Sequence, residues 1–139
     1  MQNKVITFTI FMEPVAKGRP RFGRGRTYTP EKTRTAEDEI RWHIIRMFET
    51  FAPCYEKGVP LKLEAVFYKT RPKRLPKRIC LPTGKPDIDN LLKALVDAMA
   101  GLLFLNDSQI TSVTARKRYG DPPRIEVSLR EDTIEQEEQ

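Results

Sequence analysis

Residues 86–107 read PDIDNLLKALVDAMAGLLFLND, and this stretch decides the fold. Its apolar side chains recur with the three- and four-residue spacing of one helix face: Ile88, Leu91, Leu92, Leu95, Val96 and Met99. Gly101 is a typical residue just beyond a helix, because glycine readily adopts a left-handed backbone. The spacing therefore predicts an amphipathic helix over about 88–100, with charged and amide side chains on its opposite face.

The segments on both sides of this helix have the pattern of half-buried strands. Residues alternate with a period of two in segments 4–12 and 60–69, and two more strands, 109–118 and 123–130, are expected around the turn Tyr119-Gly120-Asp121-Pro122-Pro123. A second helix is expected over about 30–51, because Thr29 is a good N-cap and Pro30 suits the first helical position. The predicted order is β-α-β-α-β-β. It indicates an α/β (α+β) domain in which two helices pack on a mixed sheet.

The chain has the size and composition of one domain. Its 139 residues are enough for a single core. No apolar run approaches the ~20 residues of a membrane span, and no small-residue cleavage site follows the N-terminal stretch. Cys54 and Cys80 are too few for a disulfide framework or a zinc module. We therefore expect a cytoplasmic protein with reduced cysteines and no membrane segment.

Charge is unevenly distributed along the chain. The net charge is +6, yet residues 131–139 (EDTIEQEEQ) hold five acids and no base. The preceding residues contain 25 bases and 14 acids and therefore have a net charge of +11. We expect a folded domain over 1–130 and an acidic, disordered tail over 131–139.

Two basic stretches carry much of the positive charge. Residues 17–34 contain seven bases and one acid, and residues 69–85 contain seven bases and no acid. Both are rich in proline or glycine, which is typical of loops. Such loops favour a polyanionic partner, most simply nucleic acid, although charge that only keeps loops soluble has the same composition. The candidate phosphate-binding residues are Arg19, Arg21, Arg24, Arg26, Lys69, Arg71, Lys73, Arg74 and, in a later strand, Lys117.

Acidic residues gather around the predicted central helix. Asp87 stands at its N-cap position, and Asp89 and Lys93 follow on its polar face. Asp107 precedes the next strand, and a helix packed on its own following strand would bring this residue close to the other two acids. Carboxylates are the ligands of Mg²⁺, which activates bound water and neutralises charge on a phosphate. With Lys93 to stabilise developing negative charge, these residues indicate a metal-dependent nuclease.

Each of these residues also has an ordinary structural explanation. Asp87 would cap the helix, and Asp89 would suit the helix dipole and pair with Lys93 four residues on. Asp107 after Asn106 is common in turns. The alternative function is therefore a non-catalytic, basic nucleic-acid-binding module.

The run KPDIDNLLKALVDAMAGLLFLNDSQI (85–110) resembles the RusA family of Holliday-junction resolvases. The shared pattern is D-x-D-N-x-x-K at the start of a helix, a further acid in that helix, and a closing N/D-D-x-Q-[IV]. The residues that meet it here are Asp87, Asp89, Asn90, Lys93, Asp97, Asp107, Gln109 and Ile110. The segment GRTYTPEKTR (25–34) and the closing strand–turn–strand are similar to phage and prophage members of the family.

The resemblance implies a homodimeric, Mg²⁺-dependent endonuclease, with Mn²⁺ as an alternative cofactor, that acts in DNA recombination and repair. Such an enzyme nicks four-way DNA junctions in pairs and leaves 5′-phosphate and 3′-hydroxyl ends. By position, the resemblance assigns metal binding to Asp87, Asp89 and Asp107. Lys93 matches the catalytic lysine. A two-fold dimer suits a four-way junction, because two symmetric active sites can meet two symmetric strands.

Overall fold

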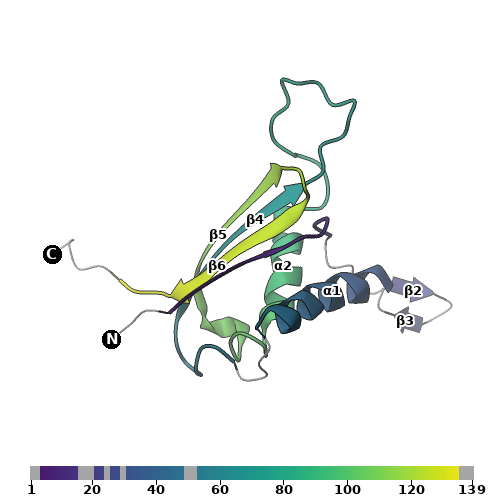
Figure 1. Cartoon of the computed structure of the whole chain (residues 1–139). Helices are drawn as coiled ribbons and strands as arrows, with labels where there is room; N and C mark the ends of the chain where they lie inside the picture. The colour runs from purple at the N-terminus through teal and green to yellow at the C-terminus, as the bar shows by residue number, and fades with distance from the viewer. Residues whose placement is uncertain (1–3, 16–20, 24–25, 29–30, 49–52, 135–139) are drawn as a thin grey trace.

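The computed structural model describes residues 4–15, 21–23, 26–28, 31–48 and 53–134. At its centre is a four-stranded sheet with the strand order β1-β6-β4-β5 (Figure 1). The strands of this sheet are β1 (Val5–Ile10), β4 (Leu61–Lys69), β5 (Ile110–Tyr119) and β6 (Arg124–Glu131). β4 and β5 are parallel, whereas β6 is antiparallel to both β1 and β4. The predicted mixed sheet is confirmed.

Two helices pack on the sheet, α1 (Glu31–Phe48) and α2 (Ile88–Met99) (Figure 1). Alternate side chains of β4 are fully buried, and the intervening ones are partly exposed; the buried set is Leu61, Leu63, Ala65 and Phe67. The helices meet these residues in one core cluster, chiefly through Ile40, Ile44, Leu91 and Leu95. Two helices on a mixed sheet were predicted, and this arrangement is confirmed. Within the described residues, neither helix has the length and hydropathy needed to cross a membrane.

The N-terminal basic stretch contains a hairpin that the loop prediction missed. β2 (Arg21–Gly23) pairs antiparallel with β3 (Arg26–Tyr28). Phe22 and Thr27, which face each other across the pair, belong to residue types that favour strands. Their preference outweighs the breaking tendency of the nearby glycines, so the prediction of a loop is wrong at these two strands.

The fold continues beyond the predicted boundary at residue 130. β6 ends at Glu131, and the backbone N–H of Asp132 donates to the Pro60 carbonyl at 2.8 Å. The carboxylate of Asp132 also accepts a hydrogen bond from the Thr111 hydroxyl at 2.7 Å. The first two acids of the expected tail thus belong to the domain, because their polar groups bond to neighbouring strands. Residues 135–139 lie outside the described residues.

The C-terminal end of α2 is fixed by an arginine from α1. The last carbonyls of a helix have no partner within the helix, and the last turn of α2 contains no basic residue. The Nη1 of Arg41 donates to the carbonyls of Ala98 at 3.1 Å and Ala100 at 3.2 Å. Gly101 follows with a φ of 85°, which confirms its predicted role as a terminator. The position of α2 therefore depends on Arg41.

Replacing Arg41 by methionine should lower the free energy of unfolding by about 1–3 kcal/mol, because partly buried carbonyls lose their donor. Urea unfolding followed by circular dichroism measures this change. Arg46→Met is the matched control, since Arg46 is exposed and stacks on Trp42 with its guanidinium carbon 4.7 Å from the ring centroid. Its loss should cost less than about 1 kcal/mol. Equal destabilisation by the two variants would contradict this role of Arg41.

Candidate active site

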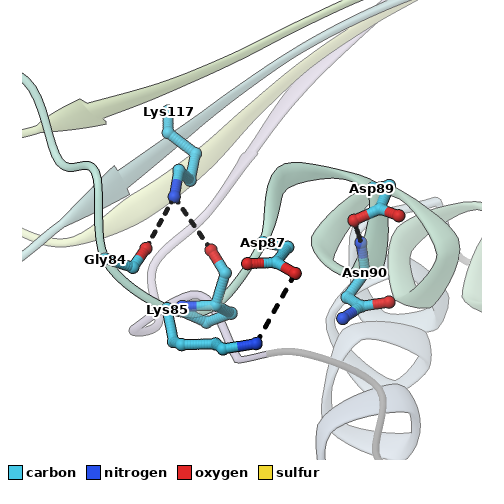
Figure 2. Close-up of polar contacts among 7 residues, drawn as sticks. Gly84, Lys85, Asp87, Asp89, Asn90 and Lys117 are labelled. Carbon is cyan, nitrogen blue, oxygen red and sulfur yellow. Dashed lines mark hydrogen bonds and ion pairs between the residues drawn. The ribbon is translucent and has the colours of Figure 1, made fainter.

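Asp87 stands at the N-cap position of α2, but its carboxylate does not cap the helix (Figure 2). Its backbone is extended, with φ −69° and ψ 148°, and its carbonyl accepts hydrogen bonds from the N–H groups of Asn90 and Leu91, both at 3.1 Å. The carboxylate lies 3.7 Å from the ammonium of Lys85, and both side chains are more than half exposed. The capping role suggested for this side chain is therefore wrong, and the carboxylate is accessible to a ligand from solvent.

Asp89 projects from the first turn of the same helix (Figure 2). Its Oδ1 accepts a hydrogen bond from the backbone N–H of Asn90 at 2.9 Å, which suits an acid at the positive end of a helix. The residue is exposed. Two accessible carboxylates, those of Asp87 and Asp89, thus lie at one end of α2.

Lys93 pairs with a different acid from the one that the spacing suggested. Its ammonium lies 3.8 Å from the carboxylate of Asp97, four residues further on. Within the described part of the chain no ion pair joins Lys93 to Asp89, whose Oδ1 bonds to the helix backbone instead. Lys93 is 62% exposed and Asp97 only 20%, so the lysine stays accessible while its partner is partly buried.

Asp107 lies at the opposite end of α2 from Asp87 and Asp89. It begins the short 3-10 helix η1 (Asp107–Gln109), directly before β5, whose first residue pairs with the first residue of β4. α2 has 12 residues, so at 1.5 Å per residue it separates the two ends by about 18 Å.

The expectation that the next strand brings Asp107 close to the other two acids is therefore wrong within one chain. Because β5 is parallel to β4, the chain must first return to the end of the sheet where β4 begins. The helix α2 makes that return. Among the described residues, accordingly, no group of three acidic, histidine or cysteine side chains is arranged to hold a metal ion.

Gln109, in the last part of the acidic motif, fixes the local backbone through the hydrogen bonds of its amide. Among the described residues Gln109 is the only buried polar or charged one. Its Oε1 accepts hydrogen bonds from the N–H groups of Leu105 and Asn106, both at 3.0 Å. Its Nε2 donates to the carbonyls of Glu56 at 2.9 Å and Val59 at 3.0 Å. These bonds fix η1, and the acid that begins it, against the segment that leads into β4.

Two of the predicted phosphate ligands hold the segment that leads into α2. The Nζ of Lys117 donates to the carbonyls of Gly84 at 2.8 Å and Pro86 at 3.0 Å (Figure 2). The Nζ of Lys69 donates to the carbonyl of Lys85 at 2.5 Å. Two lysines from the parallel strands β4 and β5 thus orient three successive carbonyls before the helix. The sequence indicated only the charge of these lysines, because their acceptors are backbone groups distant along the chain.

Arg71, a third predicted phosphate ligand, is also used within the protein. Its guanidinium donates to the carbonyls of Pro76 and Ile79, each at 2.7 Å. It also stacks on Tyr119, with its central carbon 5.4 Å from the ring centroid. The arginine therefore joins the connection after β4 to the end of β5.

The other predicted ligands lie in different surroundings. Lys73 and Arg74 are exposed. Arg21 and Arg26 belong to β2 and β3. Arg19 and Arg24 lie outside the described residues.

Comparison with known proteins gives one family and two curated relatives. The family described as Endodeoxyribonuclease RusA matches residues 12–130, most of the chain. YqaN of Bacillus subtilis strain 168, described as an uncharacterized protein, is 29% identical over 138 residues that cover 91% of this chain and 96% of YqaN. The crossover junction endodeoxyribonuclease rusA of Lactococcus phage r1t is 39% identical over 79 residues, which cover 56% of this chain and 60% of the phage protein.

The family match is not confined to the short acidic motif. It begins after β1 and extends over the other strands of the central sheet, both helices and the acids at both ends of α2. This chain therefore belongs to the RusA family of endodeoxyribonucleases.

Proposed function

We propose that this chain is a Mg²⁺-dependent, structure-selective endonuclease that resolves four-way DNA junctions by paired nicking. The family and the printed name of the phage relative support the reaction and the substrate class. The observation that carries the metal site is Asp87, an N-cap aspartate whose carboxylate does not cap and is exposed at the same helix end as Asp89. Hydrolysis of the phosphodiester would leave 5′-phosphate and 3′-hydroxyl ends.

The two carboxylates at the start of α2 fit a hard divalent cation. Mg²⁺ is usually held by one or two carboxylates, while waters and substrate phosphates complete its coordination. Asp87 and Asp89 supply such a pair, and Mn²⁺ accepts the same oxygen ligands. The bound ion would supply an activated water and neutralise charge on the phosphate.

Lys93 would act on the same phosphate from the next turn of the helix. Its pair with Asp97 keeps its ammonium on the polar face of α2, and its exposure leaves that ammonium accessible to a substrate. We assign to Lys93 the stabilisation of the negative charge that develops on the phosphate during hydrolysis.

Asp107 would join this site only from a second copy of the chain. Within one chain it lies at the far end of α2, about 18 Å away by helix length. In a two-fold dimer with antiparallel α2 helices, the end of each α2 would lie beside the start of the other. Each Asp107 would then approach the first turn of the partner's α2. The dimer would then have two equivalent sites for the two symmetric strands of a junction.

Asp89→Asn should slow single-turnover cleavage of a synthetic four-way junction in Mg²⁺ by at least about 100-fold, since the bound metal ion supplies several kcal/mol of charge stabilisation and the variant removes one of its carboxylate ligands. The amide oxygen of the variant still accepts the hydrogen bond from Asn90, so the helix start is preserved. Asp38→Asn makes the same charge change at an exposed position of α1 and should cut at the wild-type rate. Equal cutting by wild type and Asp89→Asn would contradict the site. Failure of the wild type on several junction sequences would favour the non-catalytic module.

If Asp107 acts across a dimer, a mixed dimer of two inactive variants should regain one active site. In a mixed dimer with Asp89→Asn in one chain and Asp107→Asn in the other, one site keeps all its acids and the second loses two. We expect this dimer, isolated through two different affinity tags, to nick one strand of each junction without the paired nick. Sites built within single chains would leave the mixed dimer as inactive as either variant alone. A purely monomeric chain in micromolar sedimentation would contradict paired nicking.

Lys117→Met should slow cleavage without weakening junction binding. The variant loses the donors to the carbonyls of Gly84 and Pro86, so Asp87 is no longer held in place, and we expect cleavage at least about tenfold slower. Lys117→Arg keeps donors at this position and should recover part of the rate. If Lys117 instead contacted a phosphate directly, Lys117→Met would bind the junction more weakly. The slope of log Kd against log salt would then fall by about 1.

A further inference from the structure

The 17 residues 70–86, which connect β4 to Asp87 at the start of α2, project from the end of the sheet as an extended arm (the teal loop at the top of Figure 1). Its last residues, 84–86, lead directly into the acidic start of α2. The arm and the candidate active site therefore lie at the same end of the molecule.

The arm contains a short tandem repeat that forms two similar turns. The repeat is Pro72-Lys73-Arg74-Leu75 followed by Pro76-Lys77-Arg78-Ile79. In each copy the N–H of the fourth residue donates to the carbonyl of the proline, at 3.2 Å in the first turn and 3.0 Å in the second. Because each copy closes in this way, its lysine and arginine stand at the two corner positions of a turn.

The second turn and the base of the arm are held by hydrogen bonds from neighbouring residues. Arg71 donates to the carbonyls of the first and last residues of the second turn, Pro76 and Ile79, and stacks on Tyr119 of β5. At the base of the arm, Glu13 accepts hydrogen bonds from the Thr70 hydroxyl at 2.6 Å and from its N–H at 3.1 Å. Hydrogen bonds thus support the backbone of the arm at its base and in its second turn.

The four corner residues form an uncompensated positive surface. Lys73, Arg74, Lys77 and Arg78 are exposed, while Leu75 and Ile79 between them are partly buried. Residues 69–85 contain no acid, and no ion pair involves the four cations within the described part of the chain. Four exposed cations on a fixed support, without a carboxylate partner, favour a regularly charged polyanion.

The distance from the arm to the acids limits which phosphates it can reach. Arg78 precedes Asp87 by nine residues, and a chain of that length spans at most about 32 Å. One turn of duplex DNA rises about 34 Å. The phosphate that Arg78 contacts therefore lies within about one turn of the phosphate at the acids.

We infer that residues 72–79 form a tandem-turn clamp that binds the phosphate backbone of the duplex arm next to the cleavage site. This inference rests on the proposed function for the identity of its DNA. It assigns phosphate contacts to Lys77 and Arg78, equal in weight to those of Lys73 and Arg74, because each pair occupies the two corner positions of a turn closed by the same backbone hydrogen bond. Lys69, Arg71 and Lys117 support the clamp and its base from within the protein.

Salt-dependent binding tests the clamp. The two test variants are Lys73→Gln/Arg74→Gln and Lys77→Gln/Arg78→Gln. The control, Lys57→Gln/Arg130→Gln, removes the same charge from two exposed positions outside the arm. Kd is measured by fluorescence anisotropy on a labelled four-way junction in EDTA, from 50 to 200 mM NaCl. Each lost phosphate contact lowers the slope of log Kd against log salt by about 0.9. Each test variant removes two contacts, so its slope should fall by about 2. It should also bind at least about tenfold more weakly at about 100 mM NaCl.

The control and a second substrate make the outcome decisive. The control variant should keep nearly the wild-type slope; a loss equal to that of the test variants would show a general charge effect and overturn the clamp. Unchanged binding by either test variant would also overturn it. Equal losses of affinity on the junction and on a single strand of the same length would also overturn the clamp, because the inferred partner is a duplex.

Cleavage separates failure of the clamp from failure of the proposed function. At saturating enzyme concentration both test variants should cut at the wild-type single-turnover rate, because the acids are unchanged. Test variants that lose binding while the wild type fails to cut would support the clamp and contradict the nuclease. A wild type that cuts, with test variants that bind normally, would contradict the clamp alone.

Discussion

The parallel pairing of β4 with β5 constrains the positions of all the candidate active-site residues. Parallel neighbours need a crossover connection, and here α2 provides it. The helix must return across the sheet, so its first turn lies at the end where β4 finishes and its last turn at the end where β5 begins. Asp87 and Asp89 are therefore held at one end of the domain and Asp107 at the other. A complete three-carboxylate site then requires a second chain, which makes dimerisation part of the proposed chemistry.

The basic residues divide into two groups with different physical roles. Lys69, Arg71 and Lys117 donate hydrogen bonds to backbone carbonyls and so fix the connection that leads to Asp87. The cations at the turn corners, including Lys77 and Arg78, have no such partner among the described residues and face solvent. Charged donors satisfy carbonyls well, whereas a cation without a counter-ion attracts a mobile polyanion. Residues 69–85 thus contain two of the supporting residues, Lys69 and Arg71, together with the proposed binding surface.

The acidic motif is likewise divided between chemistry and support. Its first half presents the exposed carboxylates at the start of α2. Its second half includes Gln109, whose amide bonds to four backbone groups and fixes η1. Gln109 can serve this purpose because an amide has both donors and acceptors, so each of its atoms is satisfied in a buried position. The short sequence therefore encodes both the carboxylates of the candidate site and the hydrogen bonds that position Asp107.

The sequence by itself determined the strands of the sheet, the two helices and the terminator Gly101, because burial against one core imposes periods that can be read locally. It also identified the acids, since carboxylates on a basic chain stand out by composition. The strands β2 and β3 were missed, because the glycine and proline content of residues 17–34 is typical of a loop. Only the tertiary structure placed Asp107 at the far end of α2 and paired Lys93 with Asp97. It alone showed that Lys69, Arg71 and Lys117 donate to backbone carbonyls, because every residue has a carbonyl and no sequence pattern marks which one is the acceptor.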